Sequence, residues 1–529
     1  MKKWDDKLSG SYYTPLRTVY FMREYLKKER KAYHRVLEPA AGDGRFIDLF
    51  ATDESVHALT AVELMGEKVA RLNAMQYPAK VKVLEDDFLS FAGHTDDRYH
   101  LIIGNPPYIN LKNMDEVAVK RAKALCDQYG LSQSLMQNIW VAFVLASVSC
   151  LEKNGTIFFV LPMEFLQVQY AEKVRLFLEQ KFDTIHILSF KERMFPEIEQ
   201  EACLVYLTNA MKEQPYIYFK LYEKLDSAVP YYNSKIERNK PLQKWTNAVL
   251  SDEDIDLLKA LDSRYPKVSE MCDASPGIVT GANNDFILDE SQVERLSCAD
   301  FILPTISKSA MLNGCFIVSQ STVQAMSNEG KKLYLLDLAH ADEGRFSQSL
   351  RAYLEEIGDR ENASGIKLKD RYKCRKRTPW YGVPIVRNGD LFFFKRYDRL
   401  PRICVNEANV YTTDIAYNMR LNKMYDKESM AFCFYNSLTL TQCEYYGRYY
   451  AGGVSELTPS EFKRLSIPYR MIEKDDIMRL SRMISSNEDI DKIVKFVNSK
   501  TLFDNISGEQ IAYLDGMRKR LMKRRLPSI

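Results

Sequence analysis

The first 210 or so residues alternate short apolar runs of strand length with segments whose apolar residues repeat at helical spacing. This alternation predicts strand–helix–strand units, which build a mostly parallel sheet with helices on both faces. The expected strands are residues 36–38, 58–62, 81–84, 101–103, 156–161, 184–190 and 202–207. No helical segment separates the last two, so we expect one antiparallel strand at an edge of the sheet.

The pattern changes after about residue 209. Short alternating runs, many tyrosines and phenylalanines, and scattered glycines and prolines replace the earlier rhythm, although residues 251–261 and 475–498 still have helical spacing. We therefore expect two domains, an α/β domain over residues 1–212 and a mixed α and β domain over residues 213–529.

Composition excludes several classes of protein. Of the 529 residues, 46% are hydrophobic and 27% are charged, which is typical of a globular protein and not of a disordered chain or a coiled coil. No apolar run approaches the roughly 20 residues of a membrane helix, and the charged N-terminus is not followed by the apolar segment of a secretory signal. The ten cysteines include no Cys-x-x-Cys pair, which favours free thiols in the cytoplasm and argues against a metal site.

The net charge is only +3, so overall charge indicates no particular partner. Two basic clusters stand out locally, residues 367–377, which Trp380 and Tyr381 follow, and residues 517–525. Local basic density favours contact with phosphates, although such a cluster can equally form a solvated face.

The first candidate site follows three expected strands. After the strand that ends at Glu38, the small residues of the Ala40–Gly44 loop permit close approach of a ligand to the backbone. Glu63 ends the second strand, where a carboxylate can accept both hydroxyls of a ribose, and Asp87-Phe88 ends the third, where an acid and a ring suit an adenine. An acid at the first strand end suits a cationic nucleoside, and S-adenosylmethionine fits this description.

The second candidate site is Asn105-Pro106-Pro107-Tyr108, directly after the fourth expected strand. Two consecutive prolines fix the backbone and remove two N–H donors, which leaves the Asn105 side-chain oxygen and the Pro106 carbonyl as rigid acceptors. Such a pair can accept both N–H bonds of an exocyclic amine and direct its lone pair toward a methyl group. Tyr108 offers a face on which a planar base can stack.

In their order along the chain, these motifs resemble those of gamma-class DNA adenine-N6 methyltransferases, the TaqI-like enzymes of restriction–modification systems. The similarity covers residues 11 to about 207, and three more motifs contribute to it: Ser11-Tyr12-Tyr13-Thr14-Pro15, residues 137–143, and Phe195-Pro196. The resemblance implies a class I Rossmann-like methyltransferase domain and S-adenosylmethionine as the cofactor. The cofactor-binding residues that it implies are Thr14, Glu38, Ala40, Gly42, Glu63, Asp87, Phe88, Asn105, Pro107 and Phe143.

The same resemblance implies the roles of the catalytic residues. Asn105, Pro106 and Tyr108 would act on the target amine, and Tyr108 and Phe195 would stack on opposite faces of an adenine flipped out of the duplex.

The resemblance also makes residues 213–529 a target-recognition domain for double-stranded DNA. The DNA-binding candidates there are Lys373, Arg375, Lys376, Arg377 and Trp380. We expect a monomer with no membrane partner, and a separately encoded cognate restriction endonuclease stays an open alternative.

Other methyltransferases share parts of this pattern. Asn-Pro-Pro-Tyr also occurs in enzymes that methylate a glutamine amide of translation release factors, and similar motifs occur in RNA guanine-N2 methyltransferases, but these do not usually carry so long a region after the catalytic half. A cytosine-N4 enzyme stays open, although such enzymes tend to have Ser in place of Asn105. A cytosine-C5 enzyme is excluded because its mechanism needs a Pro-Cys nucleophile, and the chain has no Pro-Cys dipeptide.

Overall fold

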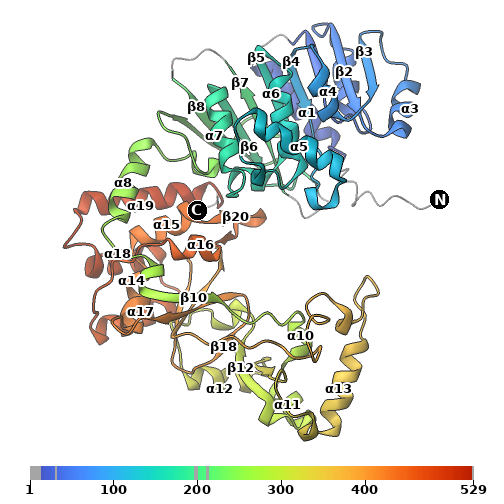
Figure 1. Ribbon diagram of the computed structural model, residues 1–529. Coiled ribbons are helices and arrows are strands. Elements are labelled where there is room, and N and C mark those ends of the chain that lie inside the picture. Colours follow the sequence, from blue (N-terminus) through green and yellow to red (C-terminus); the bar gives the residue numbers. More distant parts are fainter. Residues whose placement is uncertain (1–12, 30–32, 196–200, 210–213, 527–529) are drawn as a thin grey trace. The chain divides into compact units, whose positions relative to one another are not determined.

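The computed structural model divides into two compact units, each described separately below (Figure 1). It describes residues 13–29, 33–195, 201–209 and 214–526. Unit 1 comprises Met1–Ile255, Tyr450–Gly452 and Lys523–Ile529, and unit 2 comprises Asp256–Tyr449 and Gly453–Met522. Within the described part of the chain, every helix is too short or too polar to span a lipid bilayer.

Unit 1 is built on a nine-stranded sheet in the order β3-β2-β1-β4-β5-β7-β6-β8-β9. The strands are β1 (Arg35–Glu38), β2 (Ala58–Glu63), β3 (Val81–Glu85), β4 (Tyr99–Gly104), β5 (Leu151–Pro162), β6 (Thr184–Phe190), β7 (Ala202–Thr208), β8 (Tyr216–Tyr222) and β9 (Tyr232–Glu237). All seven expected strands are present, and β1 to β5 run parallel to one another. The expected α/β class with a Rossmann-like sheet is confirmed.

The position of the antiparallel strand differs from the expectation. β7 does not lie at an edge but between β5 and β6, antiparallel to both. Residues 203–208 of β7 are all buried, and a strand with this much apolar surface is better accommodated inside a sheet than at its edge. The sheet ends instead at β9, which pairs antiparallel with β8.

Unit 1 also extends beyond residue 212, where we expected the first domain to end. β8 follows that position, yet it pairs with β6 over seven residues and so belongs to the same sheet. The domain boundary therefore lies near residue 255 and not near 212.

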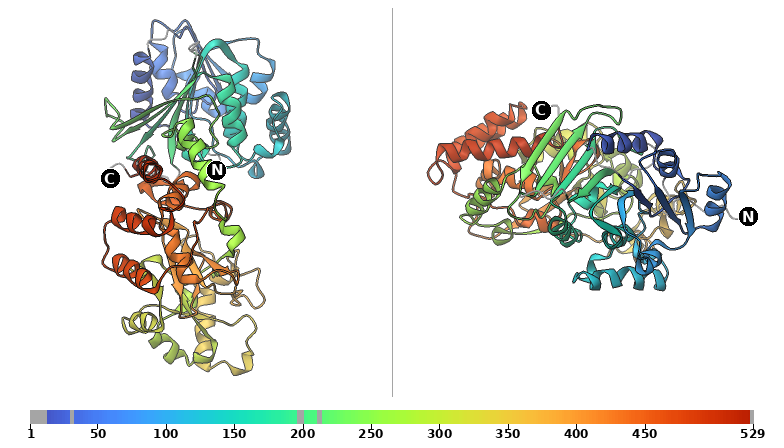
Figure 2. Two further views of the ribbon diagram at one scale, coloured as in Figure 1. Left: turned by 90° about the vertical axis from the view of Figure 1, so that its left-hand side faces the viewer. Right: turned by 90° about the horizontal axis from the view of Figure 1, so that it is seen from above.

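Helices cover both faces of the sheet of unit 1 (Figure 2, left). On one face, α1, α2 and α3 contribute to one apolar cluster with the side chains of alternate strand positions, such as Leu101 and Ile103 of β4. On the other face, α4, α5 and α6 pack against one another. The helices of unit 1 are α1 (Leu16–Lys28), α2 (Arg45–Ala51), α3 (Gly66–Ala74), α4 (Phe88–His94), α5 (Glu116–Gln128), α6 (Ile139–Ser149), α7 (Glu172–Lys181) and the first residues of α8 (Asp252–Asp262).

Unit 2 is mixed α and β, as expected. It has a five-stranded sheet (β10-β19-β15-β17-β13), a four-stranded sheet (β11-β14-β12-β18) and a three-stranded sheet (β16-β21-β20). Its strands are β10 (Cys272–Pro276), β11 (Ile287–Leu288), β12 (Ile302–Ile306), β13 (Ile317–Val318), β14 (Tyr334–Leu336), β15 (Leu391–Phe394), β16 (Arg396–Tyr397), β17 (Ile403–Asn406), β18 (Tyr411–Thr412), β19 (Ala416–Leu421), β20 (Arg448–Tyr449) and β21 (Ser455–Glu456). Its helices include α9 (Val268–Met271), α10 (Asn283–Phe286), α11 (Glu290–Leu296), α12 (Gln320–Asn328), α13 (Gln348–Asp359), α14 (Lys427–Phe434), α15 (Ser437–Tyr446), α16 (Pro459–Lys463), α17 (Lys474–Ser485), α18 (Ile490–Thr501) and α19 (Gly508–Lys523).

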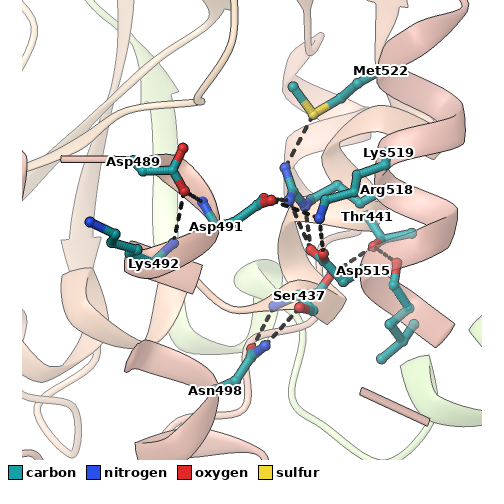
Figure 3. Close-up of polar contacts among 11 residues, drawn as sticks. Ser437, Thr441, Asp489, Asp491, Lys492, Asn498, Asp515, Arg518, Lys519 and Met522 are labelled. Carbon is teal, nitrogen blue, oxygen red and sulfur yellow. Dashed lines mark hydrogen bonds and ion pairs between the residues drawn. The ribbon is translucent and has the colours of Figure 1, made fainter. Parts of the chain in front are cut away.

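The helical structure expected over residues 475–498 consists of two helices, α17 and α18. Asn487 between them has a positive φ of 52°, and Asp489 starts α18 by accepting hydrogen bonds from the N–H groups of residues 491 and 492. Figure 3 shows how α18 is then tied to its neighbours: Asn498 bonds to Ser437 of α15, and Arg518 of α19 is paired with Asp491 at 2.7 Å. Much of the basic cluster over residues 517–525 is thus used inside the fold, because Arg518, Arg524 and Arg525 are buried.

Candidate active site

The loop after β1 brings the backbone close to its neighbours. Gly42 and Gly44 have positive φ values of 58° and 85°, which side-chain-bearing residues rarely adopt. A Cβ atom on Gly44 would lie 2.6 Å from Leu72 of α3 and 2.9 Å from the hydroxyl of Tyr77. Packing and backbone conformation therefore both favour glycine at position 44.

Glu38, the last residue of β1, is a buried acid. Its side chain is 2% exposed, and its Oε2 atom has no hydrogen-bond partner among the described residues. Burial raises the pKa of this carboxyl well above its usual range, and the nearby Asp43 and Glu63 raise it further. An enclosed carboxylate in this state is stabilised by a cationic ligand, because a positive charge nearby favours its ionised form.

Glu63 at the end of β2 holds two backbone segments. Its Oε2 accepts a hydrogen bond from the N–H of Gly42 at 2.8 Å, and its Oε1 accepts one from the N–H of Met65 at 3.0 Å. Each oxygen keeps one lone pair with which it can accept a further hydrogen bond.

The N-terminal motif lies against the same loop. Arg45 donates to the carbonyl of Thr14 at 2.8 Å and to Asp43 at 2.7 Å, and its guanidinium lies 5.8 Å from the centre of the Tyr13 ring. The Tyr13 ring is 3.6 Å from the position that a Cβ of Gly42 would take. The structure thus places Tyr13 against Gly42 and ties Thr14 to Arg45 at the end of the same loop, while Ser11 and Tyr12 lie outside the described residues.

The third strand end forms an aromatic wall. Phe88 begins α4 and Phe143 lies on α6, and their rings are 5.0 Å apart between centres. Asp87 caps α4 by accepting from the N–H of Leu89 at 3.0 Å, and its other oxygen is paired with Arg121 of α5. Arg121 was not among the sequence candidates, because a charge in the middle of a helix gives no indication of its partner.

The fourth strand end carries Asn105-Pro106-Pro107-Tyr108. β4 pairs with β1, and a Cβ on Gly104 would lie 3.4 Å from Pro39, so this motif starts beside the Glu38–Gly44 loop. Asn105, Pro107 and Tyr108 are half-buried and Pro106 is buried. The Tyr108 hydroxyl donates to the carbonyl of Val160 in β5 at 3.1 Å, which fixes the ring, and burial raises the pKa of this phenol well above its usual range.

The segment after Tyr108 connects the second candidate site to the aromatic wall. Ile139 donates to the carbonyl of Ile109 at 2.9 Å, and Leu111 donates to that of Gln137 at 3.1 Å. The start of α6, four residues before Phe143, is therefore anchored to the segment that follows the Asn105–Tyr108 loop. The strand ends of unit 1 thus bring the sequence candidates together at one edge of the sheet.

Phe195 is the exception. Its side chain is 6% exposed and belongs to the apolar cluster beneath α1 and α2, and Pro196 lies outside the described residues. Stacking of Phe195 on a target base therefore stays a prediction, and in this structure the ring supports the core.

The DNA-binding candidates in unit 2 are of two kinds. Lys373, Arg375 and Lys376 are exposed. Arg377 instead donates to the carbonyls of residues 279 and 280 at 2.8 Å each, and Trp380 packs half-buried against Gly358 and Phe286. The structure thus assigns Arg377 and Trp380 to the support of this region. The basic sequence pattern alone does not distinguish the exposed candidates from those held by contacts within the fold, because these contacts are made with residues far away in sequence.

Comparison with known families agrees with this geometry. Residues 46–195 match the model described as "Eco57I restriction-modification methylase". Residues 242–502 match the model described as "Type II methyltransferase M.Eco57I, C-terminal domain". The first match covers the part of the candidate site from Glu63 to Phe143, whereas Thr14 and the Glu38–Gly44 loop precede it. The second match covers most of unit 2.

Individual relatives are similar over nearly the whole chain. The Type II methyltransferase M.AccI of Acinetobacter calcoaceticus is 22% identical over 95% of this chain and 94% of its own length. M.HindII of Haemophilus influenzae is also 22% identical, over 91% and 94%. The solved structure of the Type IIL restriction-modification enzyme MmeI, in complex with DNA, has the same fold, with a TM-score of 0.57, 12% identity, and coverage of 97% of this chain and 75% of that one. The chain thus belongs to the gamma-class DNA methyltransferases of restriction–modification systems.

Proposed function

We propose that this methyltransferase transfers a methyl group from S-adenosylmethionine to the N6 amine of an adenine that is flipped out of double-stranded DNA. The observation that carries the proposal is the Asn105-Pro106-Pro107-Tyr108 loop at the end of β4, directly beside the Glu38–Gly44 loop. Unit 1 would carry the reaction, and unit 2 would recognise the target sequence.

The residues around the loops suit S-adenosylmethionine. The buried Glu38 carboxyl, with its unpartnered Oε2, fits a cationic ligand, and Glu63 is placed to accept the ribose hydroxyls. Phe88 and Phe143 would hold the adenine of the cofactor, with Asp87 as the acceptor of its amine. When bound, the cofactor supplies an activated methyl group. Thr14, Ala40, Gly42, Asn105 and Pro107 complete the set of residues proposed to contact it.

The target amine would be held by two acceptors of the loop. The Asn105 side-chain oxygen and the Pro106 carbonyl accept hydrogen bonds from the two N–H groups of the amine. These hydrogen bonds withdraw the nitrogen lone pair from conjugation with the ring and direct it at the methyl group. As the N–C bond forms, the bond between the methyl carbon and the sulfur of the cofactor would break, and the sulfur would keep the electron pair. The surplus proton of the amine would then pass to solvent, so no general base is required. Tyr108, fixed through Val160, would stack on the flipped base.

The test is base-resolution detection of methylated bases in DNA from cells that express the wild-type chain or Asn105→Ala, together with mass spectrometry of the nucleosides. We expect N6-methyladenine at one short sequence motif with the wild type and none with the variant. N4-methylcytosine at a motif would instead assign the chain to the cytosine-N4 enzymes. Unmethylated DNA with both chains would refute a DNA substrate and favour an RNA base or a protein amide.

A further inference from the structure

The basic run of unit 2, residues 367–377, contains cations that the fold neutralises and cations that it does not. Lys367 and Lys369 both pair with Asp359, at 2.9 and 2.8 Å. Arg377 donates both of its terminal nitrogens to backbone carbonyls. Among the described residues, no carboxylate forms an ion pair with Lys373, Arg375 or Lys376.

These three cations surround one exposed aromatic ring. Tyr372 is 57% exposed. Lys376 donates to its hydroxyl at 2.8 Å and lies 4.3 Å from the ring centre, and Lys373 and Arg375 lie 5.8 and 5.9 Å from it. Three like charges repel one another, so this arrangement gains most when an anion binds there.

The loop that carries these cations is fixed by a buried side chain and by backbone hydrogen bonds. Cys374, in the middle of the run, is fully buried in the apolar cluster that also contains Ile278 and Phe286. Turns close on either side, because Arg375 donates its N–H to the carbonyl of Arg371 and residue 377 donates to that of Cys374. The backbone is therefore ordered before any ligand arrives, which lowers the entropic cost of binding.

We propose that Tyr372, Lys373, Arg375 and Lys376, here called the Tyr372 surface, contact the phosphate backbone of duplex DNA independently of base sequence. The choice of duplex DNA as the partner rests on the proposed function. The three cations would replace condensed counterions at successive phosphates, and the Tyr372 ring would cover the adjacent deoxyribose. Such contacts fix where the protein sits on the duplex but carry no sequence information directly.

The test measures the salt dependence of DNA affinity by fluorescence anisotropy, without cofactor. Two labelled duplexes are used, one of random sequence and one with the motif found by base-resolution sequencing. For the triple variant Lys373→Gln/Arg375→Gln/Lys376→Gln, we expect the slope of log K against log salt to decrease in magnitude by about 0.9 for each lost contact, and by about 2–3 in all. The loss of affinity should be the same on both duplexes.

The matched control is Lys367→Gln/Lys369→Gln, which removes basic residues of the same run that Asp359 already neutralises. Its slope should stay close to that of the wild type, and thermal unfolding should show both variants folded. An unchanged slope in the triple variant would overturn the proposal, and so would a loss confined to the motif duplex, which would mean that these residues read bases. Stronger binding of single-stranded RNA than of either duplex would also overturn it.

Failure of the proposed function is detected separately. If the wild type produces no N6-methyladenine in cells, the adenine reaction is refuted, while the salt slopes on the random duplex still decide whether the Tyr372 surface contacts phosphates.

Discussion

The carboxylate of Glu63 accepts a hydrogen bond from the backbone N–H of Gly42 at 2.8 Å, which ties the end of β2 to the loop after β1. The same carboxylate accepts from Met65 through its other oxygen. Because both oxygens are oriented by backbone donors, their remaining lone pairs point in fixed directions, and a ligand that uses them does not have to order the side chain.

We expect Glu63→Gln to weaken the binding of S-adenosylmethionine. The variant loses a charged acceptor worth about 1.5–3 kcal/mol, which corresponds to roughly ten- to hundredfold in affinity. Isothermal titration calorimetry measures the effect, with Glu67→Gln, which removes an exposed acid of α3, as the control. Asp87→Asn should show a loss of similar size. Wild-type affinity in both variants would refute cofactor binding by these strand ends.

We expect Asn105→Ala to abolish methyl transfer while cofactor affinity stays within a few fold of the wild type. The reason is that the Asn105 oxygen would act on the target amine rather than on the bulk of the cofactor. Transfer of a radiolabelled methyl group to DNA gives the rate, and Asn113→Ala, an exposed asparagine eight residues along the chain, is the control. A variant that retains more than about a tenth of wild-type turnover would contradict the proposed role.

We expect Glu38→Gln to stabilise the free protein and to weaken cofactor binding. The pKa of Glu38 is raised in the folded state, so folded protein binds this proton more tightly than unfolded protein does, and the free energy of unfolding decreases as the pH rises above the usual carboxyl pKa. Because glutamine is neutral at every pH, the Glu38→Gln variant should not lose free energy of unfolding in this way.

At pH 8, urea denaturation should show a gain of about 1–3 kcal/mol for Glu38→Gln. Calorimetry should show at least tenfold weaker binding of S-adenosylmethionine. A variant less stable than the wild type at this pH would mean that the carboxylate is compensated in the free protein.

Phe195→Leu separates a base-stacking role from a packing role. Leucine keeps apolar volume in the buried cluster but removes the aromatic face, so a merely structural ring should tolerate the change at a cost of under about 1.5 kcal/mol in stability. If Phe195 stacks on the flipped base, DNA binding should weaken by about 1–3 kcal/mol, and much less on DNA with an abasic target position.

Fluorescence anisotropy of labelled duplexes measures binding to normal and abasic DNA. The fluorescence of 2-aminopurine at the target position, which rises when the base leaves the stack, reports base flipping separately, and Phe190→Leu is the control on the same face of the sheet. Equal losses on normal and abasic DNA would show that Phe195 only supports the fold.

Acid should destabilise unit 1 through His186. Burial, and then the nearby Lys220, lower the pKa of this histidine to about 3, and its Nδ1 is hydrogen-bonded to the hydroxyl of Tyr25 at 2.7 Å. Because unfolded histidine titrates near 6.5, the unfolded state binds more protons between pH 6.5 and about 3. The stabilisation is therefore complete above pH 6.5 and is lost as the pH falls through that window, at about 1.4 kcal/mol per pH unit at most.

Thermal unfolding from pH 8 to pH 4 measures this dependence. The melting temperature of the wild type should fall more steeply below pH 6.5 than that of His186→Gln, whereas the exposed His57→Gln should follow the wild type. Parallel curves for the wild type and His186→Gln would assign the acid sensitivity to other groups.

The sequence by itself determined the strands of the sheet and the residues at their ends. Strand-length apolar runs, small residues after Glu38 and consecutive prolines after Asn105 are local patterns, and each acts through the backbone within a few residues. A parallel sheet brings those strand ends to one side, which is why the sequence alone predicted that Glu38, Glu63, Asp87 and Asn105 lie near one another.

Only the tertiary structure decided which strands are neighbours and which charges are available. Pairing of β7 with both β5 and β6, and the continuation of the sheet into β8 and β9, depend on contacts between distant segments. The same holds for Arg377, which is bound by carbonyls nearly a hundred residues away, and for Lys376, which is left beside an exposed ring. Local patterns fix what a segment can form, but hydrogen-bond partners and burial are settled by long-range packing, which a single sequence does not specify.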